Sequence, residues 1–555
     1  MKRTMLALAL MTPLAFATPR DALVMQINSA IGSLEPAQAV VTYDTLPVQQ
    51  FFEGLYYSDF GTAKPLLASR VQQSGDGKVS TFSLRRNVKF HDGSAMACSD
   101  VEYSLRRTLL VGNETSQAAQ VRANILAIGG FTPEVKKTFT FQELSQIVKC
   151  NASGQLVLTL ERNVPSLLIN LTSAYVVPQK LLVVSGDWSG TAKDFEAFMG
   201  KDVSNSSLAQ KPVGTGAYSF VARDPSRLVL KAFDGYWGAK PALKNVIIQK
   251  VDNDTARVLA LQTGDADIST VPDRDTLERL KGVPGVTVYE QLPLRDLAPV
   301  MMFNHDIKDG ARLPAGQLAE NNVPTNFFTD IHARKGFAAA FDIETFTRDA
   351  LKGKGQSMNT TLPPNSWAND PSIKRPAFSL KTAADELKLA FGGKLWSTGF
   401  TVPTIVIAGD GTSQVVAGIL KQNIEKLNPK FHVEINTVEL SAGNAALFQS
   451  KFSVIALTWG GPDPDTVLRG LYSANGILSS AINIKDPKLE TLLDEANNAI
   501  GQNARKPLYR AILRYLNEQT YAFPLAVQLA FAATSADLKG YETFHKTNLF
   551  RFLSK

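Results

Sequence analysis

The chain has 555 residues, of which 44% are hydrophobic and 20% charged, so it can bury a sizeable core and is expected to divide into two or three domains. This composition excludes a disordered or fibrous protein. The net charge of +7 is spread along the chain rather than gathered into basic runs, which argues against nucleic acid as a partner. Beyond the N-terminus no apolar run approaches the length of about 20 residues that a spanning helix needs.

The first 17 residues have the pattern of an export signal. Lys2 and Arg3 form a basic start, residues 5–14 are apolar but too few to span a bilayer, and Ala15 and Ala17 place small residues at the positions that determine cleavage. We therefore expect a signal peptide over residues 1–17. No cysteine follows the cut, so the sequence predicts a soluble protein in a periplasm or medium, without a lipid anchor.

The first half of the mature chain is rich in predicted strands. A short apolar strand is expected at 23–27, and a hairpin strand at 79–84 follows a turn at 74–77. One βαβ unit is then predicted from a strand at 246–251, a helix at 255–262 that Asp254 caps and Gly264 ends, and a strand at 267–269.

Cys98 and Cys150 are the only two cysteines of the chain. Cys98 lies just before a helix predicted at 99–105, and Cys150 before a strand predicted at 155–160. In an oxidising compartment an even count in a large domain indicates one disulfide. Two buried free thiols are the alternative, because a sequence does not give the distance between two side chains.

The second half alternates strands and helices in the manner of a wound α/β domain. The predicted elements are a strand at 404–408, a helix at 414–427, a strand at 432–438, a short helix at 445–449, a strand at 453–458, and helices at 487–500 and 508–517. The chain therefore contains two α/β bodies.

Sequence motifs of catalysis and metal binding are missing. We find no Gly-x-Ser-x-Gly elbow, Ser-x-x-Lys pair or His-Glu-x-x-His helix, and the glycines at 214–216 lack the Lys-Ser/Thr that would follow in a phosphate loop. The five histidines are not spaced as metal ligands. The sequence thus predicts no catalytic residue, metal or cofactor, and favours a small-ligand site in a cleft between two lobes.

Six segments, in this order, resemble those of one known family. They are the Phe-His-Asp-Gly turn at 90–93 with the helix after it, the glycine turn at 212–218, the Tyr-Trp-Gly loop at 234–238, the helix at 333–342, and the loops at 362–367 and 459–465. In these segments the chain is similar to the family 5 extracellular solute-binding proteins, the dipeptide- and oligopeptide-binding receptors of ABC importers. The resemblance covers nearly the whole mature chain.

The resemblance implies an α/β, two-lobed periplasmic-binding-protein fold of the cluster C type. Lobe I holds both chain ends and carries an extra subdomain, and two hinge crossings are expected near 288–295 and 523–528. The implied boundaries are 18–45 and 176–287 for lobe I, 46–175 for its extra subdomain, 288–525 for lobe II, and 526–555 for the return to lobe I. Both cysteines fall in the extra subdomain, which supports their pairing.

The resemblance also implies a set of ligand contacts by position. The candidates in lobe I are Gly32, Ser33, Leu34 and Tyr43, and those in lobe II are Asn304, Trp367, Trp459, Gly460 and Gly461. Glycines let a ligand backbone approach closely, and tryptophans offer apolar or stacking faces. Both tryptophans are equally well explained as core residues, and Asn304 as a residue that satisfies local backbone.

One departure from the family pattern concerns charge. Peptide-binding relatives often have Trp-x-x-Asp-Tyr-x-Asp-Pro where this chain runs from Trp459 to Pro464, and the first of those acids, which pairs with the ammonium group of the peptide, is deleted here. Asp463 and Asp465 are the candidates to replace it. A turn and helix cap before a helix at 466–472 is the favoured alternative for both.

The implied function is that of an extracytoplasmic receptor that closes on an oligopeptide-like ligand and delivers it to an ABC permease in the inner membrane. No chemistry on the ligand, no nucleic acid partner and a monomeric state are expected. An oligosaccharide or a chelated metal is the alternative ligand. An exported hydrolase or a chaperone is a second alternative that no catalytic motif supports.

Overall fold

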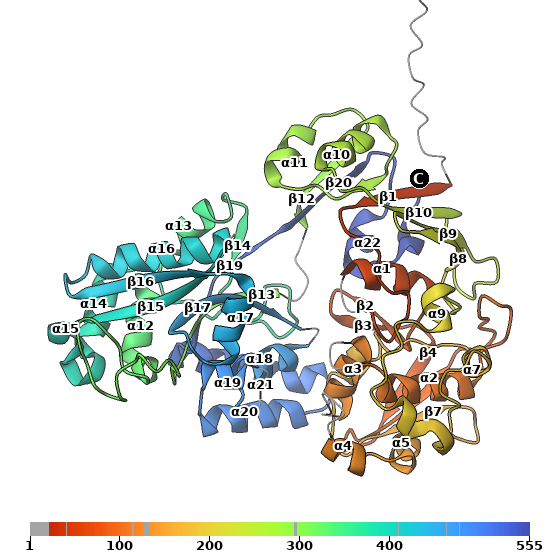
Figure 1. Cartoon of the computed structure of the whole chain (residues 1–555), viewed down its shortest axis with the longest axis horizontal. Helices are drawn as coiled ribbons and strands as arrows, with labels where there is room; N and C mark the ends of the chain where they lie inside the picture. The colour runs from red at the N-terminus through yellow and green to blue at the C-terminus, as the bar shows by residue number, and fades with distance from the viewer. Residues whose placement is uncertain are drawn as a thin grey trace, which may run out of the picture.

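In the computed structural model, the described residues are 21–39, 42–113, 116–126, 128, 133–292, 297–408, 410–461, 463–474, 476 and 478–555. The predicted signal segment, 1–17, lies outside these residues. Figure 1 shows two bodies joined by long strands, each built around its own sheet. Within the described part of the chain, no helix is both long and apolar enough to cross a membrane.

A seven-stranded sheet organises the first body, which we call lobe I. Its strand order is β12 (Val286–Leu292), β20 (Ala530–Ser535), β11 (Ile268–Ser269), β1 (Ala22–Ile27), β10 (Asn245–Lys250), β9 (Arg227–Ala232) and β8 (Tyr218–Asp224). β1 lies parallel to both β10 and β11, while the remaining pairs are antiparallel. The predicted βαβ unit is confirmed, because α10 (Asp254–Thr263) connects β10 to β11.

One detail of this unit differs from the prediction. The cap of α10 is Asn253, whose side chain accepts the amide of Ala256 at 2.8 Å, whereas Asp254 is the first helical residue. Asp254 instead pairs with Arg257 one turn later. The predicted stop is correct, since Gly264 ends the helix at a φ of 79°, a conformation that glycine adopts without strain.

A second, four-stranded antiparallel sheet belongs to the same lobe. Its order is β4 (Ala68–Gln73), β5 (Val79–Leu84), β7 (Leu156–Thr159) and β6 (Val148–Cys150). The helices of this part of the chain are α2 (Cys98–Leu110), α3 (Gln117–Leu126), α4 (Pro133–Thr138), α5 (Phe141–Ile147), α6 (Leu167–Asn170), α7 (Gln179–Val184), α8 (Phe195–Phe198) and α9 (Ser207–Gln210), and α2 and α5 contact β6 and β7. The predicted disulfide is present: Cys98 begins α2 and bonds to Cys150 at the end of β6, with 6.1 Å between their Cα atoms.

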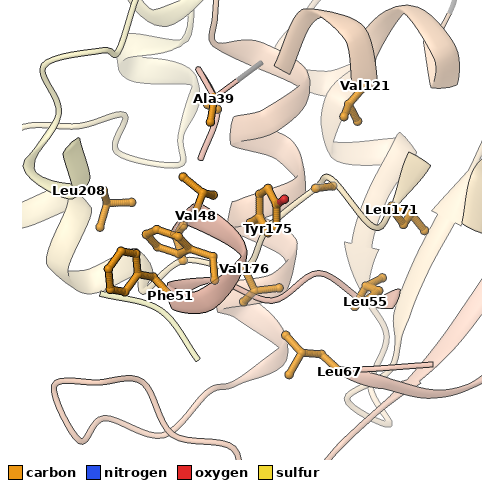
Figure 2. Close-up of a cluster of buried hydrophobic side chains, with 14 of the residues drawn as sticks. Ala39, Val48, Phe51, Leu55, Leu67, Val121, Leu171, Tyr175, Val176 and Leu208 are labelled. Carbon is orange, nitrogen blue, oxygen red and sulfur yellow. The ribbon is translucent and has the colours of Figure 1, made fainter. Parts of the chain in front are cut away.

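Both sheets of lobe I share one hydrophobic core. α1 (Thr42–Phe51) lies between them, and Figure 2 shows its Val48 and Phe51 beside Tyr175 and Val176. The same buried cluster includes Leu23 of β1 and Phe82 of β5, so the core is continuous from one sheet to the other. The hairpin of β2 (Tyr56–Asp59) and β3 (Thr62–Pro65) follows α1.

The second body, lobe II, is built on a five-stranded sheet. Its order is β16 (Phe431–Val438), β15 (Phe400–Ile407), β17 (Val454–Gly460), β13 (Leu297–Phe303) and β18 (Ala522–Pro524), and a small sheet pairs β14 (Gly355–Ser357) with β19 (Ala526–Gln528). Successive residues of a strand face opposite sides. Accordingly Met301 and Phe303 of β13 enter one buried cluster, and Val300 and Met302 enter another.

Helices cover both faces of the lobe II sheet. They are α12 (Ile331–Ala340), α13 (Ile343–Asp349), α14 (Leu380–Leu389), α15 (Leu395–Thr398), α16 (Gly411–Glu425), α17 (Leu440–Phe448), α18 (Pro464–Tyr472), α19 (Ser479–Ile482), α20 (Pro487–Asn498) and α21 (Gln502–Gln519). The predicted strands and helices of this half are present, but α17 and α21 begin five or six residues earlier than expected.

The chain changes sheet twice. β12 lies in the lobe I sheet and β13 in the lobe II sheet, and on the return β19 pairs within lobe II before β20 enters lobe I. Both changes occur a few residues after the predicted boundaries at 288 and 526. The helices α11 (Arg274–Leu280) and α22 (Tyr541–Thr547) lie on the lobe I side. The domain boundaries themselves remain a prediction.

Candidate functional site

A small pocket lies where the two lobes meet. From lobe I it is lined by Phe60, Gly61 and Thr62, the turn between β2 and β3. From lobe II it is lined by the loop 362–367 and by residues that precede and begin α18. Its volume is about 50 Å³, which is too small to hold a complete ligand.

A second contact joins the lobes close to α20. The Asn163 Nδ2 donates to the main-chain oxygen of Asn497 at 2.9 Å. In Figure 1 this helix lies at the lower edge of the molecule, on the side away from β12 and β20. The lobes therefore touch at the edge opposite the strands that connect them.

Trp367 is one of the predicted site residues that line the pocket. Its ring packs edge-on against Tyr509, with 5.8 Å between ring centroids, and the guanidinium of Arg505 lies 5.4 Å from its centre. Tyr509 and Arg505, both on α21, hold the ring in place. Because it is partly buried and also lines the pocket, Trp367 offers a preformed apolar wall to a ligand.

Asp463 brings a carboxylate to the same pocket, but the carboxylate already has partners. It is the N-cap of α18, accepting the amide of Asp465 at 3.0 Å. Arg505 donates to both of its oxygens, at 2.5 and 3.1 Å, and also to the hydroxyl of Tyr509 at 2.6 Å. Asp463 and Arg505 are both buried, so this is a closed, neutral pair.

Asp465 is the second residue of α18, two positions after Asp463, and is held by its own helix. Its carboxylate accepts from Arg469 at 3.1 Å. Burial raises the pKa of Asp465 above its ordinary value, while Arg469 acts in the opposite direction. Neither acid therefore presents a carboxylate without a partner to a ligand ammonium group.

Trp459 lies at the end of β17 and packs against α18. A side chain at Gly470 would come within 2.7 Å of the indole Nε1, so glycine is needed for this close approach. Nε1 is buried and has no hydrogen-bond partner among the described residues. Gly460 is the last residue of β17, and Gly461 lines the pocket.

The remaining predicted contacts are engaged elsewhere. Leu34 is fully buried in the lobe I core. The Ser33 hydroxyl donates to the Ser204 carbonyl at 3.4 Å, and the Gly32 carbonyl accepts from Arg223 at 2.8 Å. The Tyr43 side chain lies outside the described residues.

Asn304 is also fully buried and satisfies local backbone. Its Nδ2 donates to the carbonyls of Ser450 and Phe452 at 3.1 and 2.8 Å, and its Oδ1 accepts the amide of Asp306 at 3.0 Å. Its ligand role and that of Leu34 rest on the resemblance alone, and we do not include them in the proposed site.

Sequence reasoning missed several pocket residues. Phe60 to Thr62 carry no motif that marks a ligand contact, and Asn365 and Ser366 lie in the recognised loop 362–367 but were not singled out as contacts. Arg505 and Tyr509 are about 40 residues from Asp463 along the chain, on a helix whose predicted start excluded Arg505. The only signal in the sequence was the spacing of Arg505 and Tyr509. The two residues are four apart, so both polar side chains lie on the buried face of α21.

Comparison with known proteins assigns this two-lobed arrangement to a family. A model of the bacterial extracellular solute-binding proteins, family 5 Middle, matches residues 62–479. The chain belongs to this family. The predicted resemblance is thus confirmed.

Individual relatives are distant but match over most of their length. Heme-binding protein A of Haemophilus influenzae is 23% identical over 86% of this chain and 81% of its own, and the dipeptide-binding protein of Escherichia coli is 22% identical over 90% and 88%. The solved open form of MppA, a periplasmic murein tripeptide binding protein, has a TM-score of 0.75 and 20% identity, covering 97% of this chain and 98% of that one. This likeness confirms the expected fold.

Proposed function

We propose that the chain is a periplasmic receptor of an ABC importer that closes on an oligopeptide-like ligand between its lobes and delivers it to a membrane permease. The observation that carries the proposal is the pocket that both lobes line, in a chain of the family 5 solute-binding proteins. Relatives named for dipeptide and murein tripeptide binding support a peptide-like ligand.

The pocket chemistry refines this proposal. With the Asp463 carboxylate neutralised by Arg505, the part of the ligand that enters the pocket is uncharged and contacts Trp367. Recognition of a free N-terminal amine at this position is therefore not part of the proposal. The receptor releases its ligand unchanged, as a monomer that is free in the periplasm after removal of residues 1–17.

An oligosaccharide or a chelated metal is the second candidate ligand. The exposed part of the Trp367 ring favours it, because an aromatic face stacks as well on a sugar ring or a planar chelate as on a peptide. Heme-binding protein A, a relative of this chain, is named for a ligand that is not a peptide, which supports this alternative.

Native mass spectrometry of gently purified protein tests the proposal. The expected result is an added mass that fragments into amino acids and is lost on denaturation. Thermal-shift panels of di- to pentapeptides, oligosaccharides and metal chelates then rank the classes. Stabilisation by sugars or chelates alone would transfer the assignment to the second candidate, and no stabilisation by any class would contradict both.

A further inference from the structure

The two strands that lead out of lobe I lie side by side and are irregular at one point. β12 and β20 pair in antiparallel register from Val286 to Tyr289, and the register then shifts, so that Glu290 and Gln291 face the single residue Phe531. This is a β-bulge, which disrupts the ladder locally. One residue further along, Leu529 belongs to neither β19 nor β20.

Arg274, the first residue of α11, fills this irregular point. Its Nη1 donates to the carbonyl of Glu290 at 3.1 Å, and its Nη2 donates to the carbonyl of Leu529 at 2.6 Å. The guanidinium lies 4.9 Å from the centre of the Phe531 ring. Only 7% of the residue is exposed. One planar side chain thus bonds to β12 and to the residue that directly precedes β20, and it stacks on Phe531 of β20.

These bonds go to carbonyls that the sheet does not use in a regular ladder. Main-chain carbonyls that leave a regular ladder need another donor, and a guanidinium can serve two acceptors in a fixed geometry. A lysine ammonium at this position is a single point charge on a flexible stem and does not reproduce the arrangement. The contact therefore depends on arginine in particular.

Charged pairs around this point are of a different kind. Lys352 of lobe II pairs with Asp275 at 2.8 Å, and Lys354 lies 3.5 Å from Glu290. The side chains of these two pairs are between 35% and 67% exposed, and salt screens solvent-accessible pairs. The buried contacts of Arg274 are not expected to share that sensitivity.

We propose that Arg274 is a positioning residue that pins both connecting strands to α11 and so fixes the pivot about which the lobes close. The part of this inference that concerns lobe closure rests on the proposed function. The part that concerns the contacts of Arg274 with the strands does not. Without the pin, the ligand-free receptor samples more lobe orientations, and binding must then restrict them.

Hydrogen exchange of the ligand-free, full-length protein tests the pin directly. In Arg274→Lys and Arg274→Leu, amides of 286–292 and 530–535 are expected to exchange at least tenfold faster than in the wild type, with 22–27 and 245–250 of the same sheet unchanged. Raising the salt concentration should not alter this difference. Arg279 provides matched controls, because it lies on the same helix, is exposed and bonds to Thr276 rather than to the strands.

Three results would overturn the proposal. The first is unchanged exchange in both Arg274 variants. The second is an equal increase in exchange in Arg279→Lys and Arg279→Leu. The third is that both Arg274 variants lose protection over the whole lobe I sheet or unfold. The last would make Arg274 a general stabiliser of the lobe. Affinity for a peptide that binds the wild type should fall severalfold in the Arg274 variants. If no peptide binds the wild type, the proposed function fails, while the exchange result still decides the pin.

Discussion

At the scale of single residues, the Asp463–Arg505 pair determines what the pocket can recognise. The Asp463 carboxylate already accepts from Nη1 and Nη2 of Arg505 and from a helix amide. It has little capacity left for a ligand ammonium group. Removing one partner of a buried pair leaves the other charged and unpaired, which is strongly destabilising. The pair therefore acts on stability and on the placement of Trp367.

We expect Asp463→Asn to lower the free energy of unfolding by about 3 kcal/mol, because Arg505 loses its counterion while asparagine keeps the cap. Chemical denaturation measures this loss. Isothermal titration should give equal affinities for a peptide and its N-acetylated form in both proteins. Asp494→Asn is the matched control, since Asp494 is an exposed acid of the neighbouring helix.

The opposite pattern would indicate that Asp463 binds the ammonium group of a peptide ligand. If Asp463→Asn left stability unchanged and weakened only the binding of the peptide with a free amine, Asp463 would be the ligand contact that the sequence raised as a candidate.

In the double variant Asp463→Asn/Arg505→Gln we expect a loss of unfolding free energy smaller than the sum of the single losses, because the two residues share one interaction.

His91 gives a pH-dependent prediction. Its Nδ1 accepts the amide of Gly214, so its Nε2 carries the proton and donates to the carbonyl of Gly216. Burial lowers the pKa of His91 from 6.5 to about 4, and protonation would place a second N–H against the Gly214 amide. Between these values the unfolded chain binds more protons, so stability is complete above pH 6.5 and is lost as the pH falls toward 4.

The contribution of His91 to this loss is up to about 3 kcal/mol. Unfolding free energies measured from pH 7 to 4 should therefore fall less steeply in His91→Gln than in the wild type. His432→Gln, at an exposed histidine, should parallel the wild type. Identical slopes for His91→Gln and the wild type would show that His91 does not titrate in this window.

The residue scale also shows where sequence reasoning reached its limit. Local motifs mark Trp367, Gly461 and Asp463, so the sequence could point to them. All three line the pocket. Arg505 could not be predicted, because only the tertiary fold, in which α18 and α21 both pack against α20, brings it near Asp463. Leu34 and Asn304 were placed by position in a family pattern, which carries no information on side-chain burial.

At the scale of elements, periodicity predicted most strands and helices because their buried faces are regular. Apolar residues of α16, such as Val416, Ile419 and Leu420, recur at helical spacing and are buried. Helix starts were less predictable. The predicted start of α21 was residue 508, yet the helix begins at Gln502 and contains Pro507; it packs against α20.

The disulfide gives a prediction at this scale. It joins the start of α2 to the end of β6 across a separation of 52 residues. Closing a loop of that length lowers the entropy of the unfolded chain and so raises the free energy of unfolding by about 4 kcal/mol. Reduction should therefore shift urea unfolding of the wild type by about that free energy. A Cys98→Ser/Cys150→Ser variant should match the reduced wild type and be insensitive to reductant; an unchanged transition on reduction would contradict this estimate.

At the scale of the whole molecule, the structure combines two connecting strands at one edge with contacts between lobes at the other. A ligand held between lobes must contact both of them, and it favours closure only if it binds the closed form better than the open one. The small volume of the described pocket is consistent with a ligand that uses it for one group and extends further into the cleft.

Hydrogen exchange with and without a bound di- to pentapeptide tests the central claim most directly. We expect protection to rise at the same ligand concentration in the β2–β3 turn at 60–62 of lobe I and in the segments 362–367 and 463–467 of lobe II. Protection in one lobe alone, or at neither lining of the pocket despite measurable binding, would contradict a receptor that encloses its ligand between the two lobes.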